Sequence, residues 1–244
     1  MKVFKEARQF LLIIGLALVC RVAVAETYYV PSASMEPTLD IGDHLLVNKF
    51  VYGYSRYSNL LGIGPASDKR LFERMPERGD VVLFRPPGNP SDTWVKRVIG
   101  LPGDRIQVSG GRLLINGRML PVRRDGTGVM ESGDGSTLPA ARFIETMPDG
   151  REHPIYKMTS RGAVNDTPVY LVPAGHLFMM GDDRDNSLDS RVAIEEGGAG
   201  LVPMENLVGR AELRLWSWDF PVLKQPVSAW PSGLRLSRFF SRIA

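Results

Sequence analysis

The sequence after residue 26 consists of short β-type segments separated by glycine and proline, and it shows little helical periodicity. The run Val81–Phe84 ends shortly before Pro86, and the run His176–Met180 ends at Gly181. Short apolar runs bounded by such residues are typical of strands. A chain with many of them is expected to be mostly β, with folded-over antiparallel sheets or a partly open barrel.

Several other segments also have the composition of strands, whereas residues 121–165 do not. Strands are predicted at residues 45–52, 93–99, 105–108, 112–115 and 206–216. Ser109–Gly111 and Asn116–Gly117 supply turns beside two of them, since glycine tolerates the backbone of tight hairpins. Residues 121–165 are polar, glycine-rich and weakly patterned, so an inserted β/loop subdomain, rich in loops, is expected there. The expected units are therefore the amino-terminal segment 1–25, a main β domain of 26–120 with 166–244, and the insertion 121–165.

The amino terminus has the pattern of an export signal or a membrane anchor. Basic residues at positions 2, 5 and 8 precede the uncharged run Phe10–Cys20, Arg21 interrupts it, and Val22–Ala25 resumes it. The stretch is short for a spanning helix, which needs ~20 mostly apolar residues. It fits a cleaved secretory signal with Ala23–Ala25 as its cleavage site, or an uncleaved anchor in which Arg21 reaches the headgroups. Taken alone it slightly favours the cleaved signal; both alternatives export the rest of the chain, because basic residues stay on the cytoplasmic side.

Composition limits the partners and cofactors. The formal net charge is +3, and no basic stripe interleaved with aromatic residues indicates a nucleic-acid partner. The single cysteine, Cys20, excludes an intramolecular disulfide and a cysteine-rich zinc site. Aromatic residues near the carboxyl terminus stand among arginines, which suits a membrane headgroup layer; core packing is the alternative for Trp216 and Trp218. The group contains Trp216, Trp218, Phe220, Trp230, Phe239 and Phe240, with Arg235, Arg238 and Arg242.

Two serines lie in a proline-bracketed segment soon after the amino-terminal run. Ser32 and Ser34 stand between Pro31 and Pro37. Proline fixes φ and restricts the residue before it, so this segment is expected to be rigid and extended or turned. A nucleophile must be held to within about half an ångström, which a rigid segment allows. The alternative is a proline-rich linker whose serines serve solubility.

One lysine lies in a predicted strand with apolar neighbours on its own face. In a strand over Thr93–Ile99, Trp94, Lys96 and Val98 share a face. Burial lowers the pKa of a lysine by up to ~3–5 units, and a neutral amine can accept the proton of a serine. Lys96 is therefore a candidate general base. The alternative is an edge lysine that reaches water or pairs with a nearby aspartate.

A polar segment, Gly181–Arg191, comes directly after the apolar run that ends at Met180. An EF-hand calcium loop does not fit it, because Leu188 or Ser190, depending on the register, stands where the turn requires glycine. Two interpretations remain: a solvated turn, or a buried network in which hydroxyl groups and an Asp–Arg pair fix neighbouring groups. No metal site is predicted.

Taken together and in this order, the segments resemble those of bacterial type I signal peptidases, the leader peptidases, which are serine proteases with a Ser–Lys dyad. The resemblance covers most of residues 26–218 and rests on four blocks. These are Pro31–Leu39 (PSASMEPTL), Gly42–Gly53 (GDHLLVNKFVYG), Val95–Asp104 (VKRVIGLPGD) and Gly181–Arg191 (GDDRDNSLDSR). The chain departs from the family pattern at Ala33, where glycine is common, at Asp183, where asparagine is common, and over Val192–Gly200, where a short aromatic run is often present.

The resemblance implies a role for each matched residue. Ser34 is expected to be the nucleophile and Lys96 the general base, and the Ser32 hydroxyl with the Ser34 backbone N–H would form an oxyanion hole. Ser187 is expected to orient the lysine through a hydrogen bond. The remaining implied residues are Asp189 and Arg191, a structural pair beneath the site, and Tyr28, Val30 and Val95, which would line pockets for small substrate residues. The family needs no metal or cofactor.

The implied function is that of a membrane-bound endopeptidase that removes N-terminal signal peptides from exported preproteins after small residues (A-x-A), through an acyl-enzyme. The resemblance favours the anchor interpretation of residues 1–25. It implies one transmembrane helix in the bacterial inner (plasma) membrane, a cytoplasmic amino terminus, and a catalytic domain on the outer, periplasmic side. The expected partners are signal peptides and membrane lipids, with no nucleic acid, and the chain is expected to be monomeric.

Three alternatives stay open at this point. A specialised Ser–Lys peptidase, such as a conjugative-pilus maturation protease, shares the dyad. A catalytically silent, membrane-tethered binding module shares the fold, although the intact serines and lysine argue against it. A Ser–His–Asp triad is disfavoured, because none of the 3 histidines lies in a recognisable triad motif.

Overall fold

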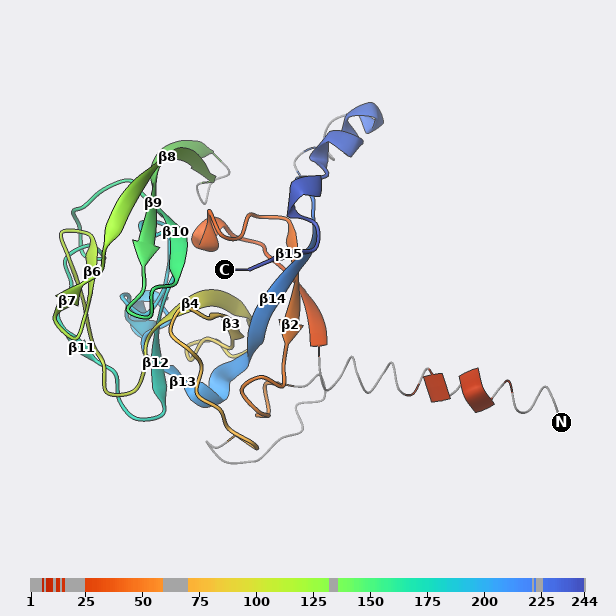
Figure 1. Ribbon diagram of the computed structural model, residues 1–244, viewed down its shortest axis with the longest axis horizontal. Helices are drawn as coiled ribbons and strands as arrows, with labels where there is room; N and C mark the ends of the chain where they lie inside the picture. Colours follow the sequence, from red (N-terminus) through yellow and green to blue (C-terminus); the bar gives the residue numbers. More distant parts are fainter. Residues whose placement is uncertain are drawn as a thin grey trace.

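The computed structural model describes residues 6, 8–10, 12, 13, 15, 25–58, 70–131, 136–220, 222 and 226–243, and these are mostly β (Figure 1). The largest sheet has the spatial order β1, β2, β14, β3, β4, β12, β13, and β15 also pairs with β14. The strands are β1 Ala25–Tyr29, β2 Asp43–Asn48, β3 Val81–Phe84, β4 Trp94–Gly100, β12 His176–Met180, β13 Val202–Pro203, β14 Leu207–Ser217 and β15 Ser241–Arg242. All their pairings are antiparallel.

The large sheet curls without closing on itself. β1 lies at one end and β13 at the other, and no pairing joins them among the described residues. The register of β14 against β2 shifts between Ala211 and Leu213 and again between Arg214 and Trp216. Such irregularities bend a strand and increase its twist. The predicted mostly β class with a folded-over, partly open sheet is therefore confirmed.

Two smaller sheets lie beside the large one, towards the left in Figure 1. One has the order β10, β9, β8, and the other has the order β11, β5, β6, β7. Their strands are β5 Arg105–Ser109, β6 Arg112–Ile115, β7 Arg118–Met119, β8 Val122–Glu131, β9 Thr137–Thr146, β10 Glu152–Lys157 and β11 Tyr170–Leu171. The short 3-10 helices are η1 Ala33–Met35, η2 Ile194–Glu196, η3 Met204–Asn206, η5 Val227–Gly233 and η6 Leu236–Arg238.

Residues 121–165 contain more strand than the predicted β/loop subdomain suggested. β8, β9 and β10 make up most of this region and form one antiparallel sheet. The described part of residues 121–165 has few buried apolar side chains: Met130, Ala140, Ile144, Met147 and Ile155. Strands that expose most of their side chains give no clear hydrophobic alternation, because that pattern follows burial.

Most other predicted strands are confirmed. β3, β6 and β12 have the predicted bounds, β5 ends one residue later than predicted, and β4 and β14 are each shifted by one residue at both ends. β2 is shorter than predicted, because the chain turns after Asn48. Among the described residues, no helix combines the length and the apolar character needed to cross a membrane. The transmembrane helix predicted within residues 1–25 falls mostly outside the residues that the structure describes.

One of the hydrophobic clusters packs directly beneath η1. Met35 and Leu39 are fully buried against side chains of β2, β3 and β14, and Val30 joins the same cluster from the other side of η1. Full burial of such side chains stabilises a fold by ~1.5–3 kcal/mol each. The core therefore anchors the chain before and after Ser34, which remains half-buried in η1.

Candidate active site

The backbone of Ser34 is fixed by local and distant contacts. Just after η1, the Leu39 N–H donates to the Met35 carbonyl at 2.9 Å. The Ser34 carbonyl accepts from the backbone N–H of Asp183 at 3.2 Å, and Asp183 belongs to the polar segment 181–191. The turn that carries Ser34 is thus held against a segment more than a hundred residues away in the sequence.

The side-chain amine of Lys96 meets the hydroxyl of Ser34. Lys96 Nζ lies 2.6 Å from Ser34 Oγ and also donates to the Val95 carbonyl at 3.1 Å. The lysine is 4% exposed, and its Nζ is 5.8 Å from the centroid of the Trp94 ring. Trp94 and Lys96 therefore lie on the same side of β4, as strand alternation predicts.

Burial changes the protonation of this amine. It lowers the pKa of Lys96 from 10.5 to about 8, and the nearby carboxylates of Asp189 and Asp182 limit the fall. A buried ammonium is disfavoured because low-dielectric surroundings stabilise its charge poorly. A substantial fraction of Lys96 is therefore neutral in mildly alkaline solution, and a neutral amine at this position can accept the Ser34 proton.

The other two candidate serines differ in their relation to this pair. Ser32 Oγ is 3.4 Å from Ser34 Oγ, and the Ser32 residue is exposed. Ser187 Oγ is buried and has no hydrogen-bond partner among the described residues. The hydrogen bond from Ser187 to Lys96 that the resemblance implies is therefore not formed in this structure. Ser187 Oγ lies instead against Gly181, where an added Cβ would collide with it and with the Ser34 carbonyl.

The Asp189–Arg191 pair holds Gly181 in this close approach. Asp189 accepts from Arg191 Nε and Nη2 at 2.9 and 2.7 Å, and from the Gly181 backbone N–H at 3.0 Å. Both charged side chains are buried. Burial alone would raise the pKa of Asp189, but the Arg191 guanidinium and these hydrogen bonds hold it below its ordinary value. The charged pair thus fixes the glycine that passes Ser34.

A second buried ion pair, which the sequence analysis did not identify, connects the strand of Lys96 to the segment of Ser34. Arg97 donates to Asp182 through Nε at 2.8 Å and Nη2 at 2.6 Å. Asp182 also accepts from the Thr38 hydroxyl at 2.5 Å. Bidentate arginine–carboxylate contacts are geometrically specific, so this pair fixes β4 relative to the loop after η1. In the sequence, the position of Arg97 directly after Lys96 was the one feature that could have indicated this ion pair.

These groups open into a cleft of about 1100 Å³. Tyr28 and Val95 line it, and Val30 is not among its lining residues. Val30 is 1% exposed and packs into the same hydrophobic cluster as Tyr28, which lies two residues earlier on the same face of the chain. Apolar lining residues that the sequence did not single out are Tyr29, Ile41, Leu45, Leu83, Val164, Leu188 and Val192.

Asp183, whose backbone contacts Ser34, is a buried carboxyl group whose charge is poorly compensated. Its Oδ1 accepts from the Asn186 backbone N–H at 3.2 Å, and its Oδ2 has no hydrogen-bond partner in the described part of the chain. Burial raises the pKa of Asp183 to about 7 and the carboxylate of Asp185 adds to the rise, while backbone N–H groups of Asp185 and Asn186 oppose it. Asp183 is thus a neutral acid below pH 7.

We expect stability to fall as Asp183 ionises, and the Asp183→Asn variant to lack this fall. The folded-state pKa of about 7 is above the ~3.9 of an unfolded aspartate, so the stabilisation is complete below pH ~4 and is lost as pH rises through about 7. Urea unfolding of both proteins at pH ~5 and pH ~8 measures this. Between these two pH values, the wild type should lose more unfolding free energy than the variant. Equal losses would contradict the assignment.

Sequence comparison finds relatives along almost the whole chain. A family model described as signal peptidase, peptidase S26, matches residues 3–216. Signal peptidase I of Rickettsia typhi is 37% identical over 255 residues, which cover 98% of this chain and 93% of the relative. Signal peptidase I of Rickettsia massiliae is 35% identical, with 98% of this chain and 92% of the relative covered.

Among solved structures, a signal peptidase I from Enterococcus faecalis V583 aligns with 56% of this chain and 97% of that chain, at 22% identity and a TM-score of 0.33. A TM-score of this size does not establish a common arrangement of strands, so the assignment depends on the sequences. The family model covers most of the chain, and the two Rickettsia relatives match it over nearly their full lengths. The chain belongs to the signal peptidase family, peptidase S26.

Proposed function

We propose that this protein is a serine endopeptidase that removes signal peptides from exported preproteins after small residues, with Ser34 as nucleophile and Lys96 as general base. The observation that carries the proposal is the 2.6 Å contact between Lys96 Nζ and Ser34 Oγ in a buried site of a signal peptidase family member. The relatives bear the name signal peptidase I, which supports the substrate class.

The contact suggests an order of proton transfers. Neutral Lys96 takes the proton from Ser34 Oγ while Oγ attacks the scissile carbonyl carbon, and the carbonyl electrons move to its oxygen. The Ser32 hydroxyl and the Ser34 backbone N–H would donate hydrogen bonds to this oxyanion. Protonated Lys96 then donates to the leaving amine, which becomes the amino terminus of the mature protein. A water molecule deprotonated by Lys96 hydrolyses the acyl ester, which frees the signal-peptide carboxylate and restores Ser34.

The strand pairing near Lys96 favours an extended substrate. β4 pairs with β12 only from Arg97 onward, so residues 93–96 have no strand partner on that side in the described part of the chain. An extended peptide can add to such an edge through main-chain hydrogen bonds. Large side chains also line the cleft there, which favours small substrate residues beside the scissile bond. They include Tyr28, Leu45, Leu83 and Trp94.

The size of the substrate residue before the scissile bond tests this function. Replacing an alanine there by leucine should lower kcat/KM by ~100-fold or more, because each methylene that a pocket excludes costs ~1–3 kcal/mol. Glycine or serine should remain accepted. The Val95→Ala variant shortens a side chain that lines the cleft and should recover part of the leucine loss. Mass spectrometry of a purified preprotein measures the cleavage. Equal rates for alanine and leucine would contradict the proposal.

The remaining expectations concern the membrane, the domains and the assembly state. We propose one span within residues 1–25 of the bacterial inner membrane, a cytoplasmic amino terminus, and a monomer whose catalytic domain (26–120 and 166–244) and inserted sheet (121–165) face the periplasm. The basic residues before the apolar run support this orientation. Exposed aromatic side chains at Phe220, Trp230 and Phe240 support additional contact with membrane lipids.

A further inference from the structure

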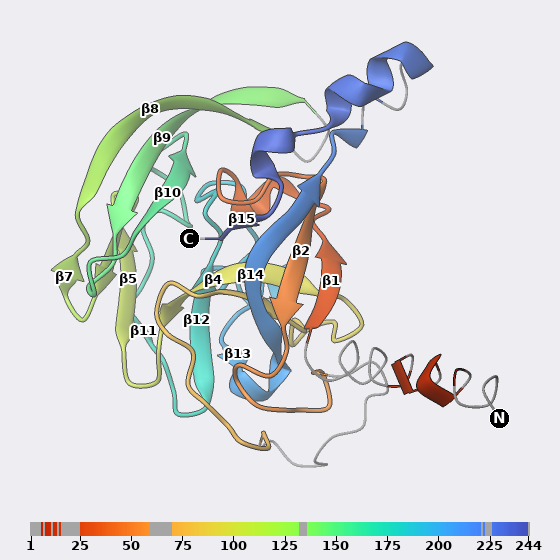
Figure 2. The ribbon, with the colours of Figure 1, turned by 45° about the vertical axis from the view of Figure 1, so that its right-hand side comes forward.

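The chain returns to the loop after Ser34 once its last long strand has ended. β14 ends at Ser217, and η6 and β15 lie within residues 234–243, which we call the C-terminal segment. In Figures 1 and 2 this dark blue segment lies beside the red-orange segment that contains Ser34. The family model matches residues 3–216, so the C-terminal segment lies outside the matched part of the chain.

Arg238 of the C-terminal segment binds the loop of residues 38–43 with all three guanidinium nitrogens. Nε and Nη2 donate to the two carboxylate oxygens of Asp43 at 2.9 and 2.5 Å. Nη1 is 2.9 Å from Asp40 Oδ2, and Nη2 also donates to the Thr38 carbonyl at 3.1 Å. The Asp43 side chain is fully buried. Such multidentate contacts fix geometry in a way that a lysine cannot reproduce.

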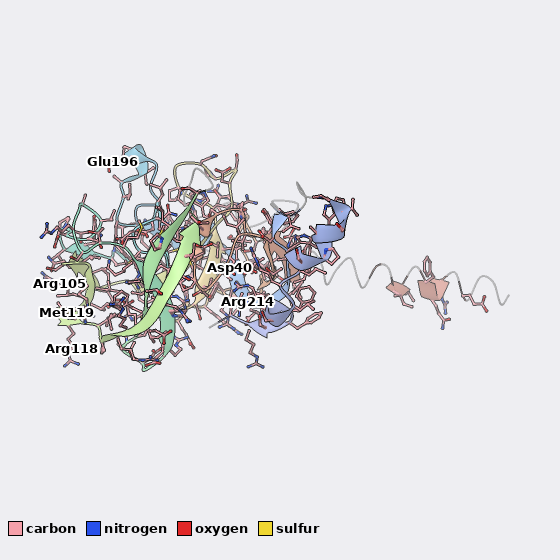
Figure 3. The ribbon with its side chains drawn as sticks, turned by 90° about the horizontal axis from the view of Figure 1, so that it is seen from above. Asp40, Arg105, Arg118, Met119, Glu196 and Arg214 are labelled. Carbon is pink, nitrogen blue, oxygen red and sulfur yellow. The ribbon has the colours of Figure 1, made fainter. Side chains whose placement is uncertain are left out.

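Two further arginines hold the same loop. Arg214 of β14 donates to the Thr38 carbonyl at 2.9 Å. Figure 3 shows Arg214 close to Asp40, and the two side chains interact electrostatically. Arg235 of the C-terminal segment donates to the Ile41 carbonyl at 2.7 Å. Since Ile41 lines the cleft, the C-terminal segment also fixes part of the cleft wall.

Thr38 links the arginines that bind the loop to the surroundings of both Ser34 and Lys96. Its carbonyl accepts from Arg214 and Arg238, and its hydroxyl donates to Asp182. Asp182 is paired with Arg97, the residue after Lys96 in β4. A displacement of the loop would therefore disturb both the turn that carries the nucleophile and the ion pair beside the base.

We propose that Arg238 is a positioning residue for the reaction, which fixes the loop 38–43 and thereby keeps Ser34 in contact with Lys96. The inference rests on the proposed roles of these two residues. A misplacement of about 1 Å can lower a rate by ~10²-fold. Without Arg238, the buried carboxylate of Asp43 loses the ion pair that joins it to the C-terminal segment, and the loop is expected to loosen.

The test compares three variants of the full chain under conditions where each is folded by circular dichroism. Arg238→Gln should lower kcat at least ~10-fold with little change in KM, because the cleft remains while the alignment is lost. Arg238→Lys keeps the charge and should recover part of the loss. Arg242→Gln is the matched control, since Arg242 lies in the same segment with an exposed side chain, and it should keep wild-type kcat. A wild-type kcat in Arg238→Gln would overturn the inference.

Hydrogen–deuterium exchange supplies a readout that does not depend on cleavage. In Arg238→Gln, exchange should rise at hydrogen-bonded amides of the loop, including those of Leu39, Gly42 and Asp43, and stay unchanged in β5 and β6. An equal rise in β5 and β6 would indicate general destabilisation and overturn the positioning role. If the wild type itself cleaves no preprotein, the proposed function fails, and exchange alone then decides whether Arg238 holds the loop.

Discussion

Replacement of Lys96 by methionine is expected to lower kcat for preprotein cleavage by ~10²–10⁴-fold with little change in KM, because the proposed general base is lost and the cleft remains. Methionine approximates the volume of the lysine, so the buried position stays filled. The amine that it removes lies 2.6 Å from Ser34 Oγ. In the wild type, kcat/KM should rise as pH increases towards about 8, where Lys96 loses its proton. Both quantities are measured on a purified preprotein.

Lys157→Met is the matched control for this experiment. Burial lowers the pKa of Lys157 to about 8 as well, but its Nζ donates to Asn165 Oδ1 at 2.8 Å and not to a serine. This variant should keep kcat within a few-fold of the wild type, with the same pH profile. Full activity in Lys96→Met would contradict the assignment of Lys96 as the base.

Removal of the Glu145 carboxylate is expected to cost ~3–5 kcal/mol of unfolding free energy, because it leaves a buried guanidinium without its counter-ion. Arg184 Nη1 donates to Glu145 Oε1 at 2.9 Å, Nη2 contacts Oε2, and the two side chains are 2% and 1% exposed. Glu145 belongs to β9, and Arg184 belongs to the segment that contacts Ser34. Urea unfolding of Glu145→Ala measures the loss of unfolding free energy. This loss shows how firmly the sheet of β8, β9 and β10 holds the segment that contains Arg184.

Glu152→Ala provides a control within the same sheet. Its partner, Arg123, is 59% exposed, and exposed pairs contribute ~0–1 kcal/mol. The double variant Glu145→Ala with Arg184→Met should be less destabilised than the sum of the two single variants, since neither charge then remains buried alone. A cost for Glu145→Ala as small as that for Glu152→Ala would show that the pair does not hold the segment.

The strands that could be predicted from the sequence are those whose burial makes an apolar run. All four residues of β3 are buried, so the run Val81–Phe84 coincides with the strand. β8, by contrast, contains Arg123, Arg124 and Asp125, and its composition resembles that of a loop. Backbone pairing with β9 defines β8, and a single sequence carries no local signal for that pairing.

The candidate site could likewise be predicted from the sequence only in part. Proline around Ser34 and strand alternation around Lys96 predicted the two groups that the structure brings together. Val30 shares a face with Tyr28, but the sequence does not show which of the two borders the cleft and which lies in the core. The Glu145–Arg184 pair joins residues 39 positions apart, each of which alone has the character of an ordinary surface residue. Contacts between distant segments, and not the motifs, are what the sequence leaves undetermined.

Cleavage of a purified preprotein with an A-x-A site by the wild type and by Ser34→Ala is the most direct test of the central claim. The amino terminus of the product is sequenced in each case. The account predicts a single mature product from the wild type, beginning directly after the second alanine, and no product from a folded Ser34→Ala protein. An intact preprotein with the wild type, or the same product from Ser34→Ala, would contradict it.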